Sequence, residues 1–498
     1  MLKNIRRIIA LISIILITLL FVDFTGTSAR MFGWLAKIQF LPALLALNFA
    51  VIITLIILTL VFGRLYCSVI CPLGIMQDGF GWLGRKSKKN RYSYSKAKTI
   101  LRVVMLLLMV ISIITGFGVA VALFAPYSSY GRIAQTLLSP VWIWINNLFA
   151  SWAEARDSYA FYSVEFRNTG WITFCVAIVT LTALGILAWR NGRTYCNTIC
   201  PVGTVLGYLS RFSILKPVID TSKCNGCGLC ARNCKSACIN SKNHTIDYGR
   251  CVTCFDCIDK CHKGAISYRY VGFSKQGNGS EKEIENQDVD KSRRGFLAVT
   301  ATVAATAAVH AQEKTVDGGL AAIVEKKRPV RKTKIVPPGA LSISNLENHC
   351  TACQLCVSAC PNGVLRPSVE LDSLMQPESS YERGYCRPEC TRCSNVCPTG
   401  AIRPISRADK SSVQIGHAVW IKENCLPLTE GVSCGNCARH CPVGAITMVY
   451  SVPGDESSPK IPVVNTEKCI GCGACENLCP SRPFSAIYVE GHENHRII

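Results

Sequence analysis

The sequence predicts an α-helical membrane domain followed by small α+β domains that are built around cysteine-bound metal clusters. Of the 498 residues, 49% are hydrophobic and the mean hydropathy is +0.26, with the apolar residues concentrated near the N-terminus. The chain also holds 30 cysteines, most of them in repeats of the form C-x2-C-x2-C-x3-C or close to it. A disulfide framework belongs to small secreted domains with irregular spacing, whereas this repeated spacing is typical of cluster ligands.

Residues 1–219 are predicted to form the membrane domain. A helix needs about 20 residues to cross a bilayer, and four apolar segments approach this length: Ile8–Val22, Phe40–Phe62, Ile100–Phe124 and Trp171–Trp189. The net charge of +22 first suggests nucleic-acid binding, but the basic residues flank apolar segments, so we expect no nucleic-acid partner. Their distribution places the N-terminus, the loop after the second segment and the stretch after the fourth in the cytoplasm. The prediction is a multi-pass protein of the bacterial inner membrane.

The second and fourth apolar segments are each followed by the motif G-R-x-Y-C-x-x-I-C-P-x-G. A parallel repeat of two helical hairpins would place both motifs on the cytoplasmic side. If the motif is helical, each cysteine pair lies on one face, and four thiolates converge on a site that suits iron-sulfur, zinc or cuprous copper. The alternative is that the cysteines are reduced and buried while Pro and Gly shape a turn. The cysteines concerned are Cys67, Cys71, Cys196 and Cys200.

Residues 220–270 are predicted to form a cytoplasmic ferredoxin-like domain with two 4Fe-4S clusters. Two C-x2-C-x2-C-x3-C runs lie here, and in two-cluster domains the fourth cysteine of each run ligates the other cluster. Lys235 and His262 stand where proline usually follows the fourth cysteine, and Cys238 and Cys175 are left without a ligand role. One cluster is assigned to Cys224, Cys227, Cys230 and Cys261, and the other to Cys251, Cys254, Cys257 and Cys234.

Residues 271–290 are predicted to be a flexible linker, and residues 291–312 join the two halves of the chain. Arg293 and Arg294 precede a mildly apolar run of Ala, Val and Thr, which is the layout of a twin-arginine export signal. This segment is expected to be a fifth membrane anchor or to be cleaved after Ala311, and a linker helix is the plainer alternative. Residues 313–340 are predicted to be an extended tether.

Residues 341–498 are predicted to form an exported ferredoxin-like domain with four 4Fe-4S clusters, which brings the expected total to six. Each of four cysteine groups ends in Cys-Pro. No histidine precedes His244 and no C-x-x-C-H motif occurs, so no haem is expected. The ligand groups are Cys350, Cys353, Cys356 and Cys360; Cys386, Cys390, Cys393 and Cys397; Cys425, Cys434, Cys437 and Cys441; and Cys469, Cys472, Cys475 and Cys479.

These motifs carry a family resemblance over nearly the whole chain. The apolar segments, paired C-x3-C-P motifs and first two cluster motifs resemble the NapH-type membrane ferredoxin subunit of periplasmic nitrate reductase systems. The twin arginine and the four later groups resemble the exported NapG-type subunit, so the chain resembles a fusion of the two. Resemblance to other four-cluster subunits also implies nested pairing of the four groups, first with fourth and second with third, with consecutive pairing as the alternative.

The resemblance implies a quinol dehydrogenase electron-transfer subunit, in which menaquinol or another quinol is oxidised. Electrons would pass to a periplasmic acceptor, a nitrate reductase-like enzyme or a c-type cytochrome. No catalytic residue is predicted, because the reaction needs no acid-base pair beyond proton release from the quinol. The alternative function is an assembly or maturation factor that supplies electrons or metal to a periplasmic or membrane metalloenzyme, since thiols at a membrane face can handle copper.

Overall fold

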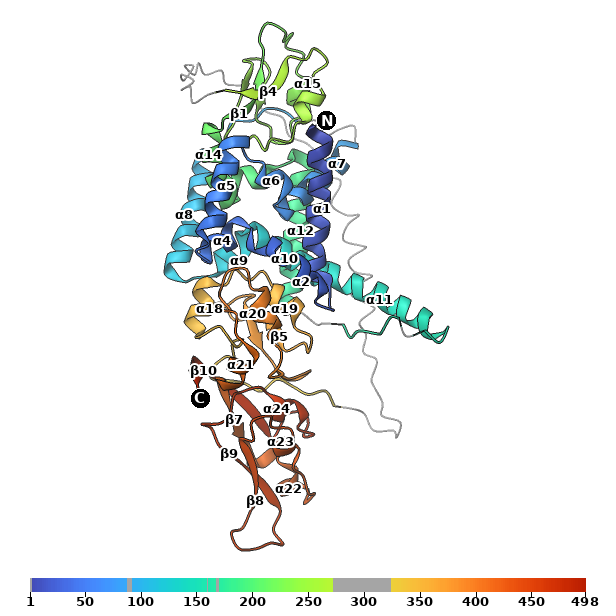
Figure 1. Cartoon of the computed structure of the whole chain (residues 1–498), viewed down its shortest axis with the longest axis vertical. Coiled ribbons are helices and arrows are strands. Elements are labelled where there is room, and N and C mark those ends of the chain that lie inside the picture. The colour runs from blue at the N-terminus through green and yellow to red at the C-terminus, as the bar shows by residue number, and fades with distance from the viewer. Residues whose placement is uncertain (1, 87–91, 159, 167–169, 272–323) are drawn as a thin grey trace, which may run out of the picture.

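The computed structural model describes residues 2–86, 92–158, 160–166, 170–271 and 324–498. Figure 1 shows an elongated molecule in three parts, with a helical domain in the middle. The N-terminal cysteine region, residues 213–271, covers one end of that domain, and the C-terminal cysteine region, residues 324–498, covers the other. The predicted linker after Val271 and the twin-arginine segment with Arg293 and Arg294 lie outside the described residues.

The four predicted apolar segments are helical, but two of them are interrupted. α1 (Leu2–Val22) and α12 (Trp171–Asn191) are continuous, and by length and composition they are the two described helices able to cross a membrane. The second segment divides into α4 (Phe40–Leu45) and α5 (Phe49–Phe62), because Leu47 turns with a φ of 51° and Asn48 caps α5. The third divides into α8 (Thr99–Thr115) and α9 (Val119–Phe124) at Gly116, whose φ is 73°.

The two copies of the repeated motif fold alike. Each forms a short helix that ends two residues before the second cysteine, and each then starts a new helix with the proline that follows this cysteine at its first position. The helices are α6 (Tyr66–Val69) and α7 (Pro72–Lys86) in one copy, and α13 (Thr194–Thr198) and α14 (Pro201–Leu209) in the other. A 3-10 turn, Ser210–Phe212, follows α14 and leads into the N-terminal cysteine region.

The remaining helices connect these elements. Short helices α2 (Thr27–Phe32) and α3 (Trp34–Lys37) follow α1. Between α9 and α12 the chain forms α10 (Pro126–Ile133), one turn of π-helix (Ala134–Leu138) and α11 (Ser139–Glu154). Figure 1 shows α11 projecting from the side of the molecule. Its exposed side chains include those of Trp142, Trp144, Phe149 and Trp152.

The N-terminal cysteine region is a small α+β unit. β1 (Leu215–Ile219) pairs antiparallel with β4 (Ile266–Tyr270), with Leu215 opposite Tyr270. β2 (Ile239–Asn240) pairs with β3 (Thr245–Ile246). Two single-turn helices, α15 (Leu229–Arg232) and α16 (Asp256–Asp259), each begin within a cysteine run.

The C-terminal cysteine region repeats the same construction on a larger scale. Three antiparallel pairs are formed, by β5 (Leu365–Pro367) with β6 (Pro377–Ser379), by β7 (Val413–Trp420) with β10 (Ile487–Ile497), and by β8 (Ile446–Tyr450) with β9 (Lys460–Val464). Its helices are α18 (Ile343–His349), α19 (Leu355–Ala359), α20 (Arg392–Val396), α21 (Arg407–Ser412), a 3-10 turn (Lys422–Asn424), α22 (Leu426–Thr429), α23 (Asn436–Arg439) and α24 (Ala474–Leu478).

The described part of the predicted tether, residues 324–340, contains no helix or strand and is bound to the C-terminal cysteine region. The Lys326 ammonium donates to the backbone carbonyls of Glu476, Asn477 and Cys479 at 2.6, 2.8 and 2.9 Å. Arg331 pairs with Glu476 at 2.5 Å, with both side chains buried. The basic residues that suggested a free linker instead bind the chain to the cysteine region, because carbonyls and a buried carboxylate are available there.

The C-terminal cysteine region packs closely against the helical domain. Phe21 of α1 and Tyr127 of α10 share one buried cluster with Cys353 and Leu355. A Cβ atom on Gly131 would lie 2.3 Å from the Cys353 carbonyl oxygen, so only glycine permits this approach of α10 to the cysteine loop.

Candidate metal centres

The second run of the N-terminal cysteine region shares a cavity with the last cysteine of the first run. The chain turns at Phe255, with φ of 62°, and α16 starts directly afterwards, which aims the run inward. The structure therefore brings together the four thiols that the cross-over rule assigns to one cluster, and adds a fifth. The cysteines lining the cavity are Cys234, Cys238, Cys251, Cys254 and Cys257.

The other set of this region lies nearer the solvent. Cys230 interacts electrostatically with Cys224 and Cys227, and Cys261 packs in the same apolar cluster as Cys230. Cys227 is exposed. These contacts bring Cys230 near the three other thiols that sequence reasoning assigns to this cluster.

The four groups of the C-terminal cysteine region pair consecutively along the chain. Cys350, Cys353 and Cys356 interact with Cys397 of the second group. Three cavities are each lined by four more thiols: Cys360, Cys386, Cys390 and Cys393; Cys425, Cys434, Cys437 and Cys479; and Cys441, Cys469, Cys472 and Cys475. Every set therefore takes three cysteines from one group and the last cysteine from its neighbour.

The nested pairing expected by resemblance is wrong. The first group exchanges its last cysteine with the second, and the third with the fourth. The physical reason is local packing: α19 lies against α20 and α23 against α24, so neighbouring groups meet without a long crossover. The two pairs also approach each other, since Cys472 interacts electrostatically with Cys386.

Cys238 was given no role by sequence reasoning. Its sulfur lies 3.5 Å from that of Cys234, and it is fully buried in the same cavity. The signal was present in the sequence, because Cys238 precedes Ile239 four residues after Cys234, as Ala265 precedes Ile266 four residues after Cys261. When the two runs are aligned, the thiol of Cys238 in the first run corresponds to the methyl group of Ala265 in the second.

The fourth cysteine of most runs accepts a backbone hydrogen bond. The N–H groups of Ala265, Ala445 and Ala486 donate to the sulfurs of Cys261, Cys441 and Cys479 at 3.3, 3.2 and 3.3 Å. Such bonds stabilise a thiolate and tune the potential of a bound cluster. Burial raises the pKa of thiols such as Cys353 to about 12 and Cys437 to about 11, so metal binding must displace protons from them.

The thiol sets have the ligand composition of a 4Fe-4S cluster. Each completed set has three cysteines from one run and the fourth from another, which is the cross-over pattern of two-cluster ferredoxin-like domains.

The C-x3-C-P cysteines form a different kind of centre, at the interface of the two repeats. Cys71 interacts electrostatically with Cys67 and Cys196, and Cys200 interacts with the other three. All four thiols are buried, with at most 4% of each residue exposed. Gln77 donates to the Cys196 sulfur at 3.2 Å, and the Gly203 amide to that of Cys200 at 3.4 Å. The predicted convergence of the four cysteines is therefore present.

Each repeat supplies an arginine that binds the other repeat. Arg64 donates to the Cys196 carbonyl at 3.2 Å, and Arg193 donates to the Cys67 carbonyl at 2.5 Å. Both side chains are fully buried. Sequence reasoning missed these residues, although the Gly-Arg pair in both copies of the motif was a signal: a charge repeated beside buried cysteines has a structural or electrostatic task.

A partly buried carboxylate connects this centre to the N-terminal cysteine region. Asp78 of α7 pairs with Arg193 at 2.7 Å, with Lys235 at 2.7 Å and with Arg6 at 3.2 Å. Lys235 also lies 3.5 Å from Asp256. Lys235, which stands where proline usually follows the fourth cysteine, therefore joins the N-terminal cysteine region to the helical domain. It lies next to Cys234, a predicted cluster ligand.

Family comparisons agree with these centres. A 4Fe-4S binding domain matches residues 44–90 and 169–218, which include both C-x3-C-P motifs. A further 4Fe-4S binding domain matches residues 346–366, and a 4Fe-4S dicluster domain matches residues 432–482. The dicluster match contains parts of the third and fourth groups, which the structure pairs with each other.

Curated relatives give the same assignment. The methylamine utilization ferredoxin-type protein MauM of Paracoccus denitrificans is 36% identical over 169 residues, which cover 32% of this chain and 73% of that protein. The chain belongs to the ferredoxin-type proteins. Ferredoxin-type protein NapH of Escherichia coli is 29% identical over 237 residues, which cover 46% of this chain and 69% of NapH. This ferredoxin-type chain is therefore an iron-sulfur protein of electron transport.

A further relative is covered over a smaller share of its length. The putative electron transport protein YccM of Escherichia coli is 25% identical over 222 residues, and the ferredoxin-type chain spans 55% of its length. No solved structure matches the chain.

Proposed function

We propose that this ferredoxin-type protein oxidises quinol in the membrane and passes the electrons to an acceptor outside the cytoplasm. The thiol sets described above would hold 4Fe-4S clusters, six in the two cysteine regions, which take up electrons one at a time. Four spans, formed by α1, α4–α5, α8–α9 and α12, would leave the N-terminal cysteine region in the cytoplasm. The NapH resemblance and the two long apolar helices support this location.

The observation that carries the proposal is a set of unpaired polar groups between the helical domain and the C-terminal cysteine region. Among the described residues, none provides a hydrogen-bond partner for the hydroxyls of Tyr127, Ser128 and Thr136 or for the side-chain amide of Gln135. All four side chains are buried. A polar group without a partner is costly in an apolar interior, so such a set indicates a ligand with hydrogen-bonding oxygens.

The position of these groups suits a quinol head. They lie on α10 and on the π-helical turn that follows it, and π-turns are frequent at functional sites. Tyr127 interacts electrostatically with Cys353 and Cys397, the thiols of the first C-terminal set. Leu138, at the end of the same turn, is 41% exposed and offers an apolar surface to a prenyl tail. A quinol bound here would release two electrons beside the thiol set and two protons to the outer side.

The test is reduction of the purified, cluster-loaded chain by a menaquinol analogue. We expect Gln135→Leu combined with Thr136→Val to slow quinol-driven reduction at least tenfold, while dithionite still reduces the clusters fully. Thr180→Val is the matched control, because the Thr180 hydroxyl already donates to the Val176 carbonyl at 2.7 Å within α12. Clusters that stay oxidised with quinol in the unaltered protein would refute the function, and equal slowing by Thr180→Val would refute the site.

The alternative of a metal-supplying maturation factor receives less support. It requires the C-x3-C-P thiols to pass a copper or zinc ion to another protein. The four thiols are enclosed, with at most 4% of each residue exposed, which suits a resident centre better than transfer of an ion. Repeated turnover of quinol by one preparation would separate a respiratory donor from a maturation factor.

A further inference from the structure

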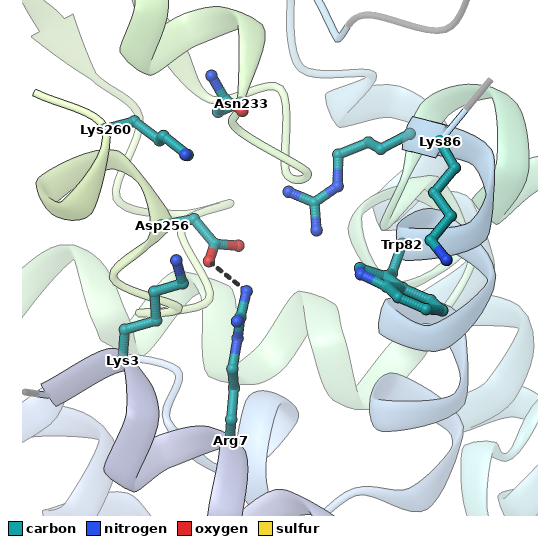
Figure 2. Close-up of a pocket in the computed structure, with 8 residues that line it drawn as sticks. Lys3, Arg7, Trp82, Lys86, Asn233, Asp256 and Lys260 are labelled. Carbon is teal, nitrogen blue, oxygen red and sulfur yellow. Dashed lines mark hydrogen bonds and ion pairs between the residues drawn. The ribbon is translucent and has the colours of Figure 1, made fainter. Parts of the chain in front are cut away.

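A cavity at the junction of the helical domain and the N-terminal cysteine region is lined mainly by cations. Figure 2 shows side chains converging on it from α1, from the end of α7, and from the loops around α15 and α16. Five of the eight lining residues are basic and one is acidic. The lining consists of Lys3, Arg7, Trp82, Arg85, Lys86, Asn233, Asp256 and Lys260.

The charges of the lining do not cancel within the protein. Arg7 lies 3.5 Å from Asp256, but Asp256 is also paired with Lys235 behind the cavity. Lys3 is paired with Asp259, outside the lining, at 2.5 Å. Arg85 and Lys260 form no ion pair with any described acid, and neither does Lys86, whose ammonium lies 4.3 Å from the centre of the Trp82 ring.

Three elements therefore hold like charges around one space. Cations that face each other across a cavity repel, and an anion placed between them removes that repulsion and joins the elements that carry them. Arginine and lysine together are the usual ligands of phosphate oxygens. Asn233 adds a neutral amide whose nitrogen is already bonded to the Leu229 carbonyl at 2.9 Å.

The surroundings of the cavity favour a lipid over a soluble anion. The helices that carry it expose apolar side chains to the bilayer side, among them Ile5 at 44%, Ile9 at 46% and Leu83 at 44%. Trp82 is 49% exposed, and tryptophan is enriched where hydrocarbon meets headgroups. Basic pockets beside helix ends on the cytoplasmic face are known sites for anionic headgroups.

We propose that this cavity binds the phosphate headgroup of an anionic phospholipid, with its acyl chains along α1 and α7. The site rests on the membrane location proposed above. The bound headgroup links α1 and α7 to the loops of the cysteine region, and so braces the junction that Asp78 and Lys235 form deeper inside.

The experiment measures lipid retention by the full cluster-loaded chain, purified in mild detergent and analysed by native mass spectrometry and lipid extraction. We expect phosphatidylglycerol or cardiolipin to be retained at about one molecule per chain. Arg85→Glu combined with Lys86→Glu should lower retention on the order of tenfold or more, because two cations near a membrane surface are reversed. Iron content and the visible spectrum establish that this variant is folded.

Lys96→Glu combined with Lys98→Glu is the matched control. It makes the same charge change on the same predicted membrane face, on exposed residues outside the cavity. Retention should be unchanged. Equal loss in both variants would mean general attraction to an anionic surface and would overturn the proposal. Protection against thermal unfolding by inorganic phosphate as strong as that by phosphatidylglycerol vesicles would assign the site to a free anion instead.

A chain that carries no anionic lipid when purified, and gains no thermal stability from phosphatidylglycerol vesicles over phosphatidylcholine vesicles, would also overturn the proposal. Fractionation of cells without detergent tests the membrane location separately. A chain found in the membrane pellet that fails the lipid test leaves the proposed function standing while the lipid site falls.

Discussion

The thiol sets of the cysteine regions and the C-x3-C-P centre hold their sulfurs by opposite means. In the cysteine regions three of four thiols come from one short run, and backbone N–H groups such as that of Ala445 donate to the fourth. In the C-x3-C-P centre the two cysteine pairs lie more than a hundred positions apart in the chain, and buried arginine side chains join them. The first kind of site is determined by local spacing, whereas the second depends on the packing of two repeats.

The C-x3-C-P centre should therefore be the more sensitive to a single added methyl group. A Cβ atom on Gly203 would lie 2.2 Å from the Cys196 carbonyl oxygen and 2.9 Å from Arg64. We expect Gly203→Ala to cost several kcal/mol, because backbone would have to move, and to abolish or sharply lower the yield of folded protein.

Gly79→Ala in α7 is the control for this substitution. Nothing lies within 4 Å of its added Cβ atom, and alanine favours helix by about 0.5–1 kcal/mol over glycine. We would measure the yield, the thermal midpoint and the iron content of both variants. Similar behaviour of Gly203→Ala and Gly79→Ala would contradict the packing described for the two repeats.

Consecutive pairing in the C-terminal cysteine region predicts how much iron is lost when two cysteines are replaced together. Cys360→Ser should remove about four irons, one 4Fe-4S cluster. Adding Cys393→Ser should remove no more, because both thiols line one cavity. Adding Cys472→Ser instead should remove about four further irons. Under nested pairing the outcome reverses, since Cys360 would then serve the fourth group.

A pH titration separates the C-terminal cysteine region from the rest of the molecule. Burial and the neighbouring His492 lower the pKa of His495 to about 4, from 6.5. Because the fold favours the neutral ring, its contribution is complete above pH 6.5 and is lost as the pH falls toward 4.

We expect a loss on the order of 2 kcal/mol over that range, measured as a lower thermal midpoint for the unfolding of this region. His495→Phe should flatten this dependence, because the ring that gains a proton is gone. An unchanged pH profile in the variant would show that His495 does not cause the acid sensitivity.

The smallest expected effect tests whether a thiol beside a cluster tunes it. Cys238→Ala should leave iron content unchanged, because four other thiols line the cavity. Loss of a polar neighbour 3.5 Å from the Cys234 sulfur should shift one reduction potential by tens of millivolts at most. Cys175→Ala, which alters a cysteine outside every set, should shift none. Loss of iron from Cys238→Ala would instead make Cys238 the ligand.

Sequence reasoning succeeded where short-range spacing determines the outcome. The run from Cys251 to Cys257 turns inward because its residues are close in the chain, and the cross-over of Cys234 follows from the pairing of two small sheets. The pairing of the four C-terminal groups was not predictable in this way. All four groups end in the same Cys-Pro pair, so their sequences do not show which groups exchange cysteines. The packing of α19 on α20 and of α23 on α24 decides it.

The break in the second apolar segment and the ion-pair network of Asp78 were also not predicted from the sequence. The segment from Phe40 to Phe62 is predicted as one apolar run, although Asn48, a residue typical of helix N-caps, marks the break next to the turn at Leu47. Asp78 was visible as a lone acid in a basic loop, but its three cationic partners come from α1, from the residue that precedes α13 and from the N-terminal cysteine region. Such a network depends on tertiary packing and leaves no periodic trace in the sequence.

The close contact of Gly131 with the Cys353 loop has a consequence for electron delivery. The face of the C-terminal cysteine region that carries the first thiol set is covered by α10, and Figure 1 shows β8, β9 and α22 at the far tip. For the electron transfer proposed above, a soluble acceptor would dock at that tip or along the sides, near the sets completed by Cys479 and Cys441. The covered set would then receive electrons, and the sets near the tip would hand them on.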